Sequence, residues 1–571
     1  MACAGIAAGS AALAQTPPQL PGAVEPGRDR PLPQPPTQPA FEFTIESPGR
    51  SQVPRAVEEL RFQLNGIRIE GAKVIPPDEL RPLYANLIGK EVSVTDILDV
   101  ADAIGDAYRQ RGYVISHAFV PPQRVRDGVF TIIVAEGYVD AVNVEGGGAG
   151  TQSLVKSYFD PVLAQRPLQL GTMERALLLA NDTNGVTASG VLRPAPSTPG
   201  ASDLVVSLSE STFAGGLNVD NRGSRFQGFW TLAGDAEANG IIAAGDQLLA
   251  SYQTSPDVLE KTAGQVRYRL PIGSDGLAAS LGVTVTHGEP GASLAPLNVI
   301  TDSYAFGPRL SYPLLRSRAE SLTFDGGFTV QSAKVNTLGF LLSHDQWRVL
   351  DVSANYSRVL LGGSAAASFD VAEGLGVLGA TTNDSTSPLG LQILSPSGAT
   401  HGNPQFTKLS GTLRYTREIW GPVNASLAAQ GQMAFAPLVA GEQIAFGGSG
   451  IGRGYDPGAI TGDHGAGGSF ELRYDQRLPE YFVDLVQPYV YYDTAKVWNV
   501  HGATSGIVVT GGGAVGVGSG LALSSVGIGI RFYFPHNIYA DVEISHTMKA
   551  VPGSDSGKRT NKLLFEAAVR F

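Results

Sequence analysis

The amino-acid sequence predicts two small units of mixed helices and strands, followed by a C-terminal antiparallel transmembrane β-barrel of about 16 strands. Three observations support this fold class. The order strand-helix-helix-strand-strand occurs twice between residues 61 and 210. From Ser211 onward, helical periodicity gives way to alternating apolar and polar residues. The chain also ends on an apolar strand edge that finishes at Phe571, and such an edge requires a partner strand.

The overall composition narrows the classes of protein that the chain can belong to. Its 571 residues carry a formal net charge of -11, which argues against a general nucleic-acid binder. Charged residues make up only 16% of the chain and 71 residues are glycine, which suits a barrel whose outer face contacts lipid. A large soluble β-protein, such as a propeller or a β-helix, fits this composition equally well. Cys3 is the single cysteine, which excludes an internal disulfide and a cysteine-based metal site.

Residues 1–14 are interpreted as the remnant of a signal peptide. Gly5–Leu13 forms a short apolar core, and Ala12-Leu13-Ala14 matches an A-x-A cleavage site. No Lys or Arg precedes the core, so either the start of the signal is missing or the segment is not a signal peptide, and we favour the first. Cys3 does not follow a Leu-Ala-Gly triplet, so we expect no lipid anchor.

Residues 15–60 are predicted to form a proline-rich, extended linker. Eleven prolines lie between Thr16 and Pro54, and a segment of this composition cannot pack a core of its own. Whether the segment also contributes a helix that plugs the barrel stays open. Only Phe41–Ile45 and Arg55–Leu60 have the residues to contribute to such a helix.

The first mixed unit is predicted over residues 61–136. A strand with a kink at Asn65-Gly66 opens it, and Pro76-Pro77-Asp78 begins a helix that Gly89 ends. Thr95 is expected to cap a second helix with Asp96 in its first turn, and Gly112 to end it. Two strands follow, over residues 113–120 and 129–134.

The second mixed unit is predicted over residues 137–210 and repeats the order of the first. Its expected elements are a strand over 139–144, helices over 154–159 and 173–181, and strands over 186–192 and 204–208. Two copies of one small unit suggest duplicated binding modules rather than a single catalytic domain.

The barrel is predicted over residues 211–571. Apolar and polar residues alternate clearly over 322–330, 350–357 and 409–415. A soluble sandwich would alternate too, but strands of about ten residues match a tilted crossing of the bilayer, whereas ordinary strands have about five or six. The uncharged run Gly502–Ile530 is long enough for a membrane helix, but its glycine runs and its final alternation indicate two strands and a loop.

No catalytic or metal site is predicted. The eight histidines are scattered, and no pair has the spacing of a helical zinc site. Gly447-Gly448-Ser449-Gly450 lacks the G-x-S-x-G pattern, and Gly511-Gly512-Gly513 has no phosphate-loop lysine. We therefore expect neither an enzyme nor a cofactor.

Five stretches of the chain, in this order, resemble the two-partner secretion transporters, the TpsB or haemolysin secretion/activation family. Tyr108–Val139 closely resembles the first POTRA domain of that family. Four further stretches look like its barrel: Val219–Ser224, Tyr268–Gly273, Tyr312–Arg318 and Gly447–Gly458. The resemblance runs from about Arg61 to Phe571, and it implies two POTRA domains, 61–136 and 137–210, before a 16-stranded barrel.

The most informative stretch is Phe446–Tyr455, which resembles the family's Arg-Gly-Tyr signature at the tip of a long loop folded into the barrel lumen. Here the signature reads Arg453-Gly454-Tyr455, with Gly452 where the family usually has Val or Leu. The resemblance implies that Arg453 pairs with an aspartate on an inner strand, and Asp493 fits that position. An arginine fork on a carboxylate is directional and bidentate, although an isolated pair in a wet lumen is worth only about 0–1 kcal/mol.

A network of charges is therefore expected around Arg453, with Glu471 and Arg473 as its further members. The simpler alternative is that Arg453 only braces the barrel wall. Both readings place the side chain inside the barrel.

By resemblance, the chain is a cell outer membrane transporter with its POTRA domains in the periplasm. The POTRA domains would capture an unfolded, secreted TpsA-like exoprotein by strand addition, and the barrel would export it, with or without activation of a haemolysin- or adhesin-like partner. The expected further partners are outer-membrane lipid and the barrel assembly machinery, through the strand that ends at Phe571. The alternatives are a barrel assembly factor and, less favoured, a passive channel.

Overall fold

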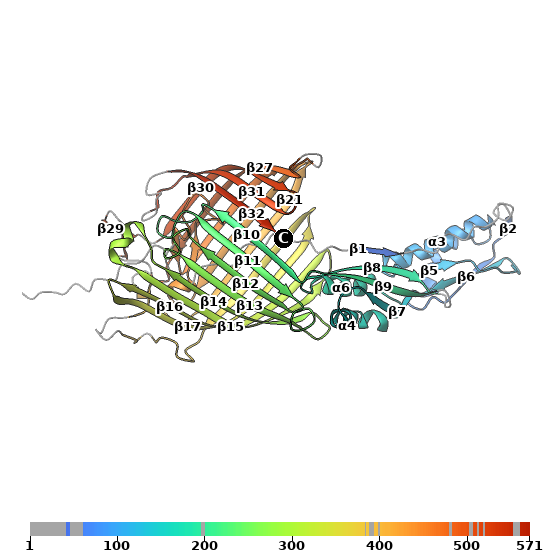
Figure 1. The fold of residues 1–571 in the computed structure, drawn as a ribbon. Helices are drawn as coiled ribbons and strands as arrows, with labels where there is room; N and C mark the ends of the chain where they lie inside the picture. Colours follow the sequence, from blue (N-terminus) through green and yellow to red (C-terminus); the bar gives the residue numbers. More distant parts are fainter. Residues whose placement is uncertain are drawn as a thin grey trace, which may run out of the picture.

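The computed structural model describes residues 42–45, 61–195, 200–382, 384–386, 393–397, 400–478, 482–501, 506–510, 513–517, 520–551 and 560–571. A β-barrel carries two smaller α/β units, which project from one of its ends (Figure 1). The predicted signal-peptide remnant, residues 1–14, lies outside the described residues, as does the predicted linker apart from residues 42–45.

The first unit is a small layered domain with its own core. Its elements are β2 (Arg61–Gln63), β3 (Gly66–Glu70), α2 (Pro77–Leu80), η2 (Arg81–Leu83), η3 (Ala85–Leu87), β4 (Glu91–Ser93), α3 (Val94–Gln110), β5 (His117–Phe119) and β6 (Val129–Ala135). The strands β3, β6 and β5 form one sheet, and β2 pairs with β4. One face of α3 packs against this sheet through Ile97, Ile104 and Tyr108, which are buried.

Two details of the first unit differ from the sequence predictions. The helix expected between Pro76 and Gly89 is broken into α2 and two 3-10 turns. Pro82 accounts for the break, because proline lacks a backbone N–H and its ring clashes with the carbonyl four residues earlier. The cap of α3 is Ser93 rather than Thr95: Ser93 Oγ accepts from Asp96 N (3.2 Å), and the Asp96 carboxylate accepts from Ser93 N (2.7 Å). These bonds with Ser93 lower the pKa of Asp96.

The second unit repeats the plan with an additional strand and an additional helix. Its elements are β1 (Glu42–Ile45), β7 (Tyr138–Glu145), α4 (Ala149–Tyr158), α5 (Asp160–Ala164), α6 (Leu170–Asn181), β8 (Val186–Pro194) and β9 (Ala201–Glu210). The sheet order is β1-β8-β9-β7, and the helices pack on one face of it around a second core. Strand β1 comes from the predicted linker and pairs in parallel with β8.

The barrel is closed and has sixteen strands, as the sequence predicts, when β25 and β26, which both pair with β27, are counted as one. The strands are β10 (Phe213–Asp220), β11 (Thr231–Asn239), β12 (Gln247–Thr254), β13 (Thr262–Ile272), β14 (Leu277–Gly288), β15 (Ile300–Arg316), β16 (Glu320–Thr337), β17 (Phe340–Leu360), β18 (Gly363–Gly374), β21 (Thr407–Trp420), β22 (Val423–Ala434), β25 (His464–Tyr474) with β26 (Gln476–Arg477), β27 (Leu485–Trp498), β30 (Leu521–Phe534), β31 (Ile538–Thr547) and β32 (Asn561–Arg570). The first strand, β10, closes the barrel on the last, β32.

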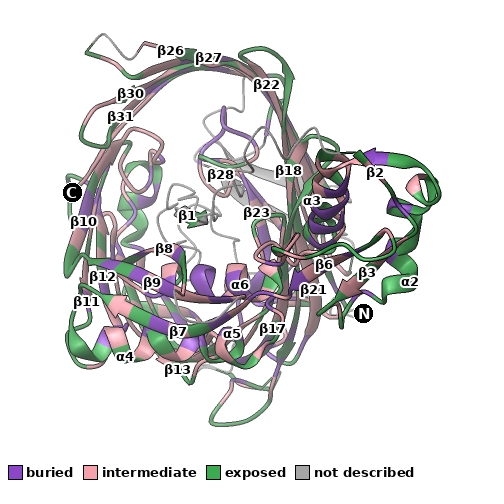
Figure 2. Ribbon diagram, turned by 90° about the vertical axis from the view of Figure 1, so that its right-hand side faces the viewer, coloured by how far each residue is buried: buried purple, intermediate pink, exposed green. Residues whose placement is uncertain are grey.

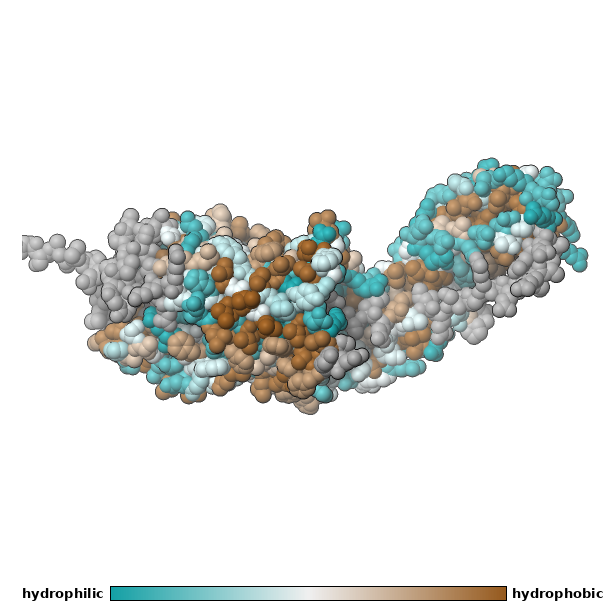
Figure 3. Space-filling view, turned by 90° about the horizontal axis from the view of Figure 1, so that it is seen from above, coloured by the Kyte–Doolittle hydropathy of each residue, from teal (hydrophilic) through white to brown (hydrophobic). Residues whose placement is uncertain are grey.

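The outer wall of the barrel is apolar because every second residue of its strands faces outward. Leu350 and Val352 on β17, and Leu563 on β32, are about half exposed or more despite being apolar. Figure 3 shows hydrophobic surface over much of the barrel wall on the face that is drawn, whereas hydrophilic surface surrounds a smaller hydrophobic area on the first unit. Within the described residues, no helix is long and apolar enough to cross a membrane.

The uncharged run Gly502–Ile530 contains three strands rather than the two expected. Strands β28 (Gly506–Thr510) and β29 (Gly513–Val517) pair with each other outside the barrel sheet, and β30 then enters the wall. Period-two alternation cannot distinguish a separate hairpin from a wall strand, because both alternate.

The second unit contacts the end of the barrel through α6. Arg316, at the end of β15, donates two hydrogen bonds to Asp182 (2.7 and 2.6 Å), and Arg318 Nε donates to Glu174 (3.1 Å). Arg175 Nη2 donates to a carbonyl oxygen of the same barrel segment (2.9 Å). Figure 2, which looks along the barrel from this end, shows β8, β9 and α6 lying in front of part of its opening.

Candidate functional site in the barrel lumen

A long loop between β22 and β25 enters the lumen. It contains η5 (Ala440–Glu442), β23 (Ile444–Phe446) and β24 (Ile460–Gly462), and β23 and β24 pair to carry a tip that spans residues 447–459. Gly447, Gly448 and Gly452 all have positive φ in this tip. Gly452 is required for a second reason as well: a Cβ there would lie 2.9 Å from Leu523 Cδ1. The glycine before Arg453 therefore fits the turn, where a Val or Leu would not.

The base of the loop is held by two buried acidic residues that sequence reasoning did not identify. Asp463 is fully buried and accepts hydrogen bonds from Ser397 Oγ (2.8 Å), Leu438 N (3.0 Å) and Val500 N (3.0 Å). Glu442 accepts from Trp347 Nε1 (2.7 Å) and pairs with Lys408. No local motif marks these residues, because their partners lie far away in the chain.

At the tip, Arg453 forms a bidentate pair with Asp493 on β27. Arg453 Nη2 donates to Asp493 Oδ1 (3.0 Å) and Nε donates to Oδ2 (3.1 Å). The same Oδ2 accepts from the backbone N–H groups of Gly452 (3.1 Å) and Arg453 (3.0 Å). Asp493 is 0% exposed and Arg453 is 8% exposed, so this is a buried pair and not the wet, isolated pair considered from the sequence.

A second carboxylate and a second arginine extend the pair into a network. Glu471 on β25 accepts from Arg453 Nη1 (2.8 Å) and from both Nη atoms of Arg531 on β30 (2.7 and 2.9 Å). Arg473, the other expected member, is placed beside a different carboxylate. Its Nε lies 3.6 Å from Asp475 Oδ1, and Arg531 takes the expected place beside Glu471. Arg473 is on the same strand as Glu471, but a cross-strand arginine reaches the carboxylate better.

The guanidinium groups of these two arginines stack on two tyrosine rings of β27. The Arg453 guanidinium lies 3.3 Å from the ring centroid of Tyr491, and that of Arg531 lies 3.8 Å from the centroid of Tyr489. The rings fit because the facing residues of β30 are glycines: a Cβ at Gly527 or Gly529 would lie 2.4–2.5 Å from them. The alternating glycines at the end of the uncharged run therefore make room for the arginine platform.

The other two signature residues hold the tip against the wall. Gly454 packs against β30 and β31, where a Cβ would lie 2.8 Å from Ser545 Oγ. The Tyr455 hydroxyl is within hydrogen-bond distance of the carbonyl oxygens of Ser524 (2.8 Å) and Lys549 (2.7 Å). Asp456 forms an ion pair with Lys562 on β32. The tip thereby contacts β25, β27, β30, β31 and β32.

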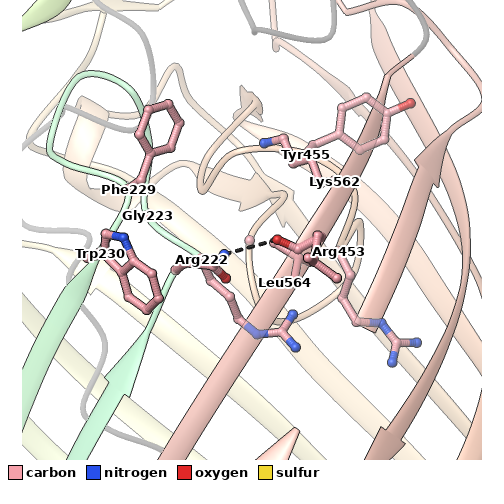
Figure 4. Close-up of a pocket in the computed structure, with 11 residues that line it drawn as sticks. Arg222, Gly223, Phe229, Trp230, Arg453, Tyr455, Lys562 and Leu564 are labelled. Atoms are coloured by element: carbon pink, nitrogen blue, oxygen red, sulfur yellow. Dashed lines mark hydrogen bonds between the residues drawn. The ribbon is translucent and has the colours of Figure 1, made fainter. Parts of the chain in front are cut away.

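A cavity of about 310 Å³ lies between the tip and the junction of β10 with β32. In Figure 4, Phe229 and Trp230 border it on one side and Tyr455 on the other. Arg222, below it, donates to Asp541 (3.0 Å) and Glu543 (3.2 Å), a second buried cluster that sequence reasoning did not identify. Among the described residues, no group of His, Cys, Asp and Glu side chains is arranged to hold a metal ion.

These features define a class of protein: an outer-membrane β-barrel with α/β domains at one end and a loop fixed in its lumen. Residues 200–522 match the family of haemolysin secretion/activation proteins ShlB/FhaC/HecB, and residues 62–137 match the ShlB-type POTRA domain. The chain therefore belongs to the ShlB/FhaC/HecB family, which is a family of outer-membrane transporters with a POTRA domain in the periplasm.

Individual relatives agree with this assignment. The chain is 26% identical over 290 residues to the heme/hemopexin transporter protein HuxB of Haemophilus influenzae, a match that covers 50% of this chain and 51% of HuxB. The chain thus spans about half the length of the curated relatives that it matches first. Its fold is similar to CdiB from Escherichia coli (TM-score 0.68, 21% identity, 91% of this chain and 92% of CdiB). It is also similar to BamA from Haemophilus ducreyi (TM-score 0.52, 14% identity, 89% of this chain and 100% of the BamA chain).

Proposed function

We propose that this protein exports one dedicated exoprotein across the outer membrane. The family assignment supports the class of function, and the loop tip in the lumen is the observation that carries the mechanism. A tip held by side chains, rather than by strands of the wall, can leave its position without opening the barrel. Export then requires the Arg453–Asp493 pair to separate, because Asp493 belongs to the wall strand β27.

In this proposal the POTRA domains bind the exoprotein first, while it is unfolded. Small sheets with free edges support this step, because an extended chain can add to such an edge through backbone hydrogen bonds with little demand on its sequence. In the first unit β3 and β5 are the edge strands, and in the second unit β7 is one. The contacts of α6 with the barrel hold the second unit in front of the opening, so a bound segment lies close to the lumen.

The network around Arg453 supports a latch rather than a simple brace. Removing one partner from a buried pair leaves an unpaired charge, at a cost of about 3–5 kcal/mol. An incoming chain therefore has to supply compensating interactions before the tip leaves. This makes the lumen selective for a chain that engages the protein over many residues.

The last strand suggests a second partner. Phe571 N donates to Gly215 O (3.0 Å) and Gly215 N donates to Phe571 O (2.9 Å), so the terminal residue closes the barrel on β10. The Phe571 side chain is 74% exposed on the outer wall. We propose that the barrel assembly machinery binds this strand before closure, while its edge is still unpaired, and that lipid contacts the ring afterwards.

The function is tested by comparing the secreted and the outer-membrane proteins of cells with and without this chain. We expect one large protein to disappear from the medium or the cell surface while other barrels keep their normal amounts. Expression of this chain from a plasmid in the cells that lack it should restore that protein. Depletion of many barrels would instead favour an assembly factor of the BamA kind, and loss of small-solute uptake alone would indicate a channel.

A further inference from the structure

The proline-rich segment before the first unit contains one stretch with the pattern of a strand. Between Pro39 and Pro48 there is no proline, and Phe41, Phe43 and Ile45 alternate with Glu42, Thr44 and Glu46. Period-two alternation of this kind is typical of a half-buried strand, and prolines at both sides limit its length. The centre of this stretch is β1, which pairs in parallel with β8 of the second unit.

The two described side chains of β1, those of Phe43 and Thr44, follow the pattern. Phe43 lies opposite Gly190 and packs, partly buried, against the core of the second unit. The Phe43 ring lies close to this glycine, since a Cβ at Gly190 would be 3.4 Å from its Cδ2. Thr44 lies opposite Val191 on the other face of the sheet and is exposed. One aromatic side chain and a short backbone ladder thus attach the segment.

This attachment covers an edge that otherwise suits strand addition. Strand β8 runs from Val186 to Pro194, and the described residues of the segment, 42–45, pair with Ser189–Leu192. A parallel ladder of four residues is short, and parallel pairs are slightly less stable per residue than antiparallel ones. Removal of β1 would expose a row of unpaired backbone groups beside the barrel opening, next to a hollow that accepts an aromatic ring.

We propose that β1 is a built-in occupant of the β8 edge, and that an extended segment of the exoprotein displaces it. This inference rests on the proposed function and adds the binding edge and its regulation. The segment that fits has an aromatic side chain flanked by polar residues, because the ring enters the place of Phe43 while its neighbours face solvent. The linker keeps this edge closed to other unfolded chains until such a segment arrives.

A disulfide that fixes β1 on β8 tests the displacement. Thr44→Cys with Val191→Cys, in a Cys3→Ser background, places two cysteines on directly paired residues, at a spacing that a disulfide can bridge. We expect oxidation to lower export by at least about tenfold and a reductant to restore it, because only the released state is competent to bind. Normal export by the oxidised variant would overturn the proposal.

A matched control uses a disulfide between two strands that stay paired whether β1 is bound to β8 or displaced. Ser189→Cys with Ser207→Cys joins β8 to β9, and it should leave export unchanged under the same oxidant. Loss of export in this control as well would attribute the effect to rigidity of the sheet and would contradict the role assigned to β1.

A binding measurement separates failure of this inference from failure of the proposed function. The probe is a labelled peptide of residues 40–47, added to the purified full-length chain. It should bind a Phe43→Ser variant about tenfold more tightly than the unchanged chain, and it should not bind the oxidised Thr44→Cys/Val191→Cys variant. Equal binding to all three would overturn the inference whatever the chain exports.

Discussion

Arg453→Ala is expected to lower export of the exoprotein by tenfold or more while the barrel remains folded. The change leaves Asp493 and Glu471 buried. Glu471 keeps its ion pair with Arg531, whereas Asp493 loses the one charged partner that it has among the described residues. Losing one member of a buried pair costs about 3–5 kcal/mol, which corresponds to a factor of 10² or more in the population of the fixed tip. In the proposed mechanism the exoprotein engages the tip while the tip is still fixed in the lumen, so a tip that is already displaced cannot respond to the exoprotein, and export falls. The sixteen-stranded wall does not depend on this pair. The measurement is the amount of exoprotein in the medium. Folding of the barrel is tested by the difference in electrophoretic mobility between unheated and heated samples.

Two further variants make this result specific. Arg453→Lys keeps the charge but loses the planar fork, so we expect an intermediate loss. Arg414→Ala removes an exposed, lumen-facing arginine of β21 and should leave export close to normal. Equal export by all three variants would show that the Arg453 pair only braces the wall. Loss of the folded barrel with Arg453→Ala would lead to the same conclusion.

Gly276→Ala is expected to release the second unit from the barrel end and to reduce export strongly. A Cβ at Gly276 would lie 2.5 Å from Leu179 Cδ2 on α6 and 2.8 Å from Pro313 Cγ, and the φ of +87° at this residue adds backbone strain. Overpacking of this kind costs about 1–3 kcal/mol, whereas each of the partly exposed ion pairs that hold the contact contributes about 0–1 kcal/mol. Protease sensitivity of the periplasmic domains measures the release.

The same turn provides the control. Gly273 also has positive φ, but nothing lies within 4 Å of its Cβ position, so Gly273→Ala carries the backbone strain without the clash. It should keep both the protease pattern and export near those of the unchanged chain. If the two variants behave alike, backbone strain in the turn explains the effect, and the contact between α6 and the barrel has no part in export.

The barrel could be predicted from the sequence because lipid and lumen impose a period of two on every strand. The loop signature and Asp493 could be predicted for a different reason, namely their resemblance to a family. The role of Arg531 could not be predicted, because its contact with Glu471 depends on how far β30 is shifted against β27. From the sequence alone, arginines close to Glu471 in the chain, such as Arg473, are the candidates for its partner. The register of β30 against β27 instead brings Arg531 to Glu471.

The smaller errors have local causes. Ser93 and Thr95 are both plausible caps, and the reciprocal bonds of Ser93 with Asp96 settle the choice at a difference of about 1 kcal/mol. Strand β1 was not predicted, because it lies in a proline-rich segment whose average composition indicates an extended linker. Apolar and polar residues alternate only in a short stretch of this segment. Buried acids such as Asp463 carry no local signal, because their partners lie far away in the chain.

The central claim is that a polypeptide passes through the lumen beside the Arg453 loop. A photo-reactive residue at Thr412 faces the lumen, whereas one at the adjacent Leu413, which is 45% exposed on the outer wall, faces lipid. During export, we expect light to join the exoprotein to position 412 and not to position 413. Cross-links at neither position, or at both equally, in cells that still export the exoprotein would contradict passage through this lumen.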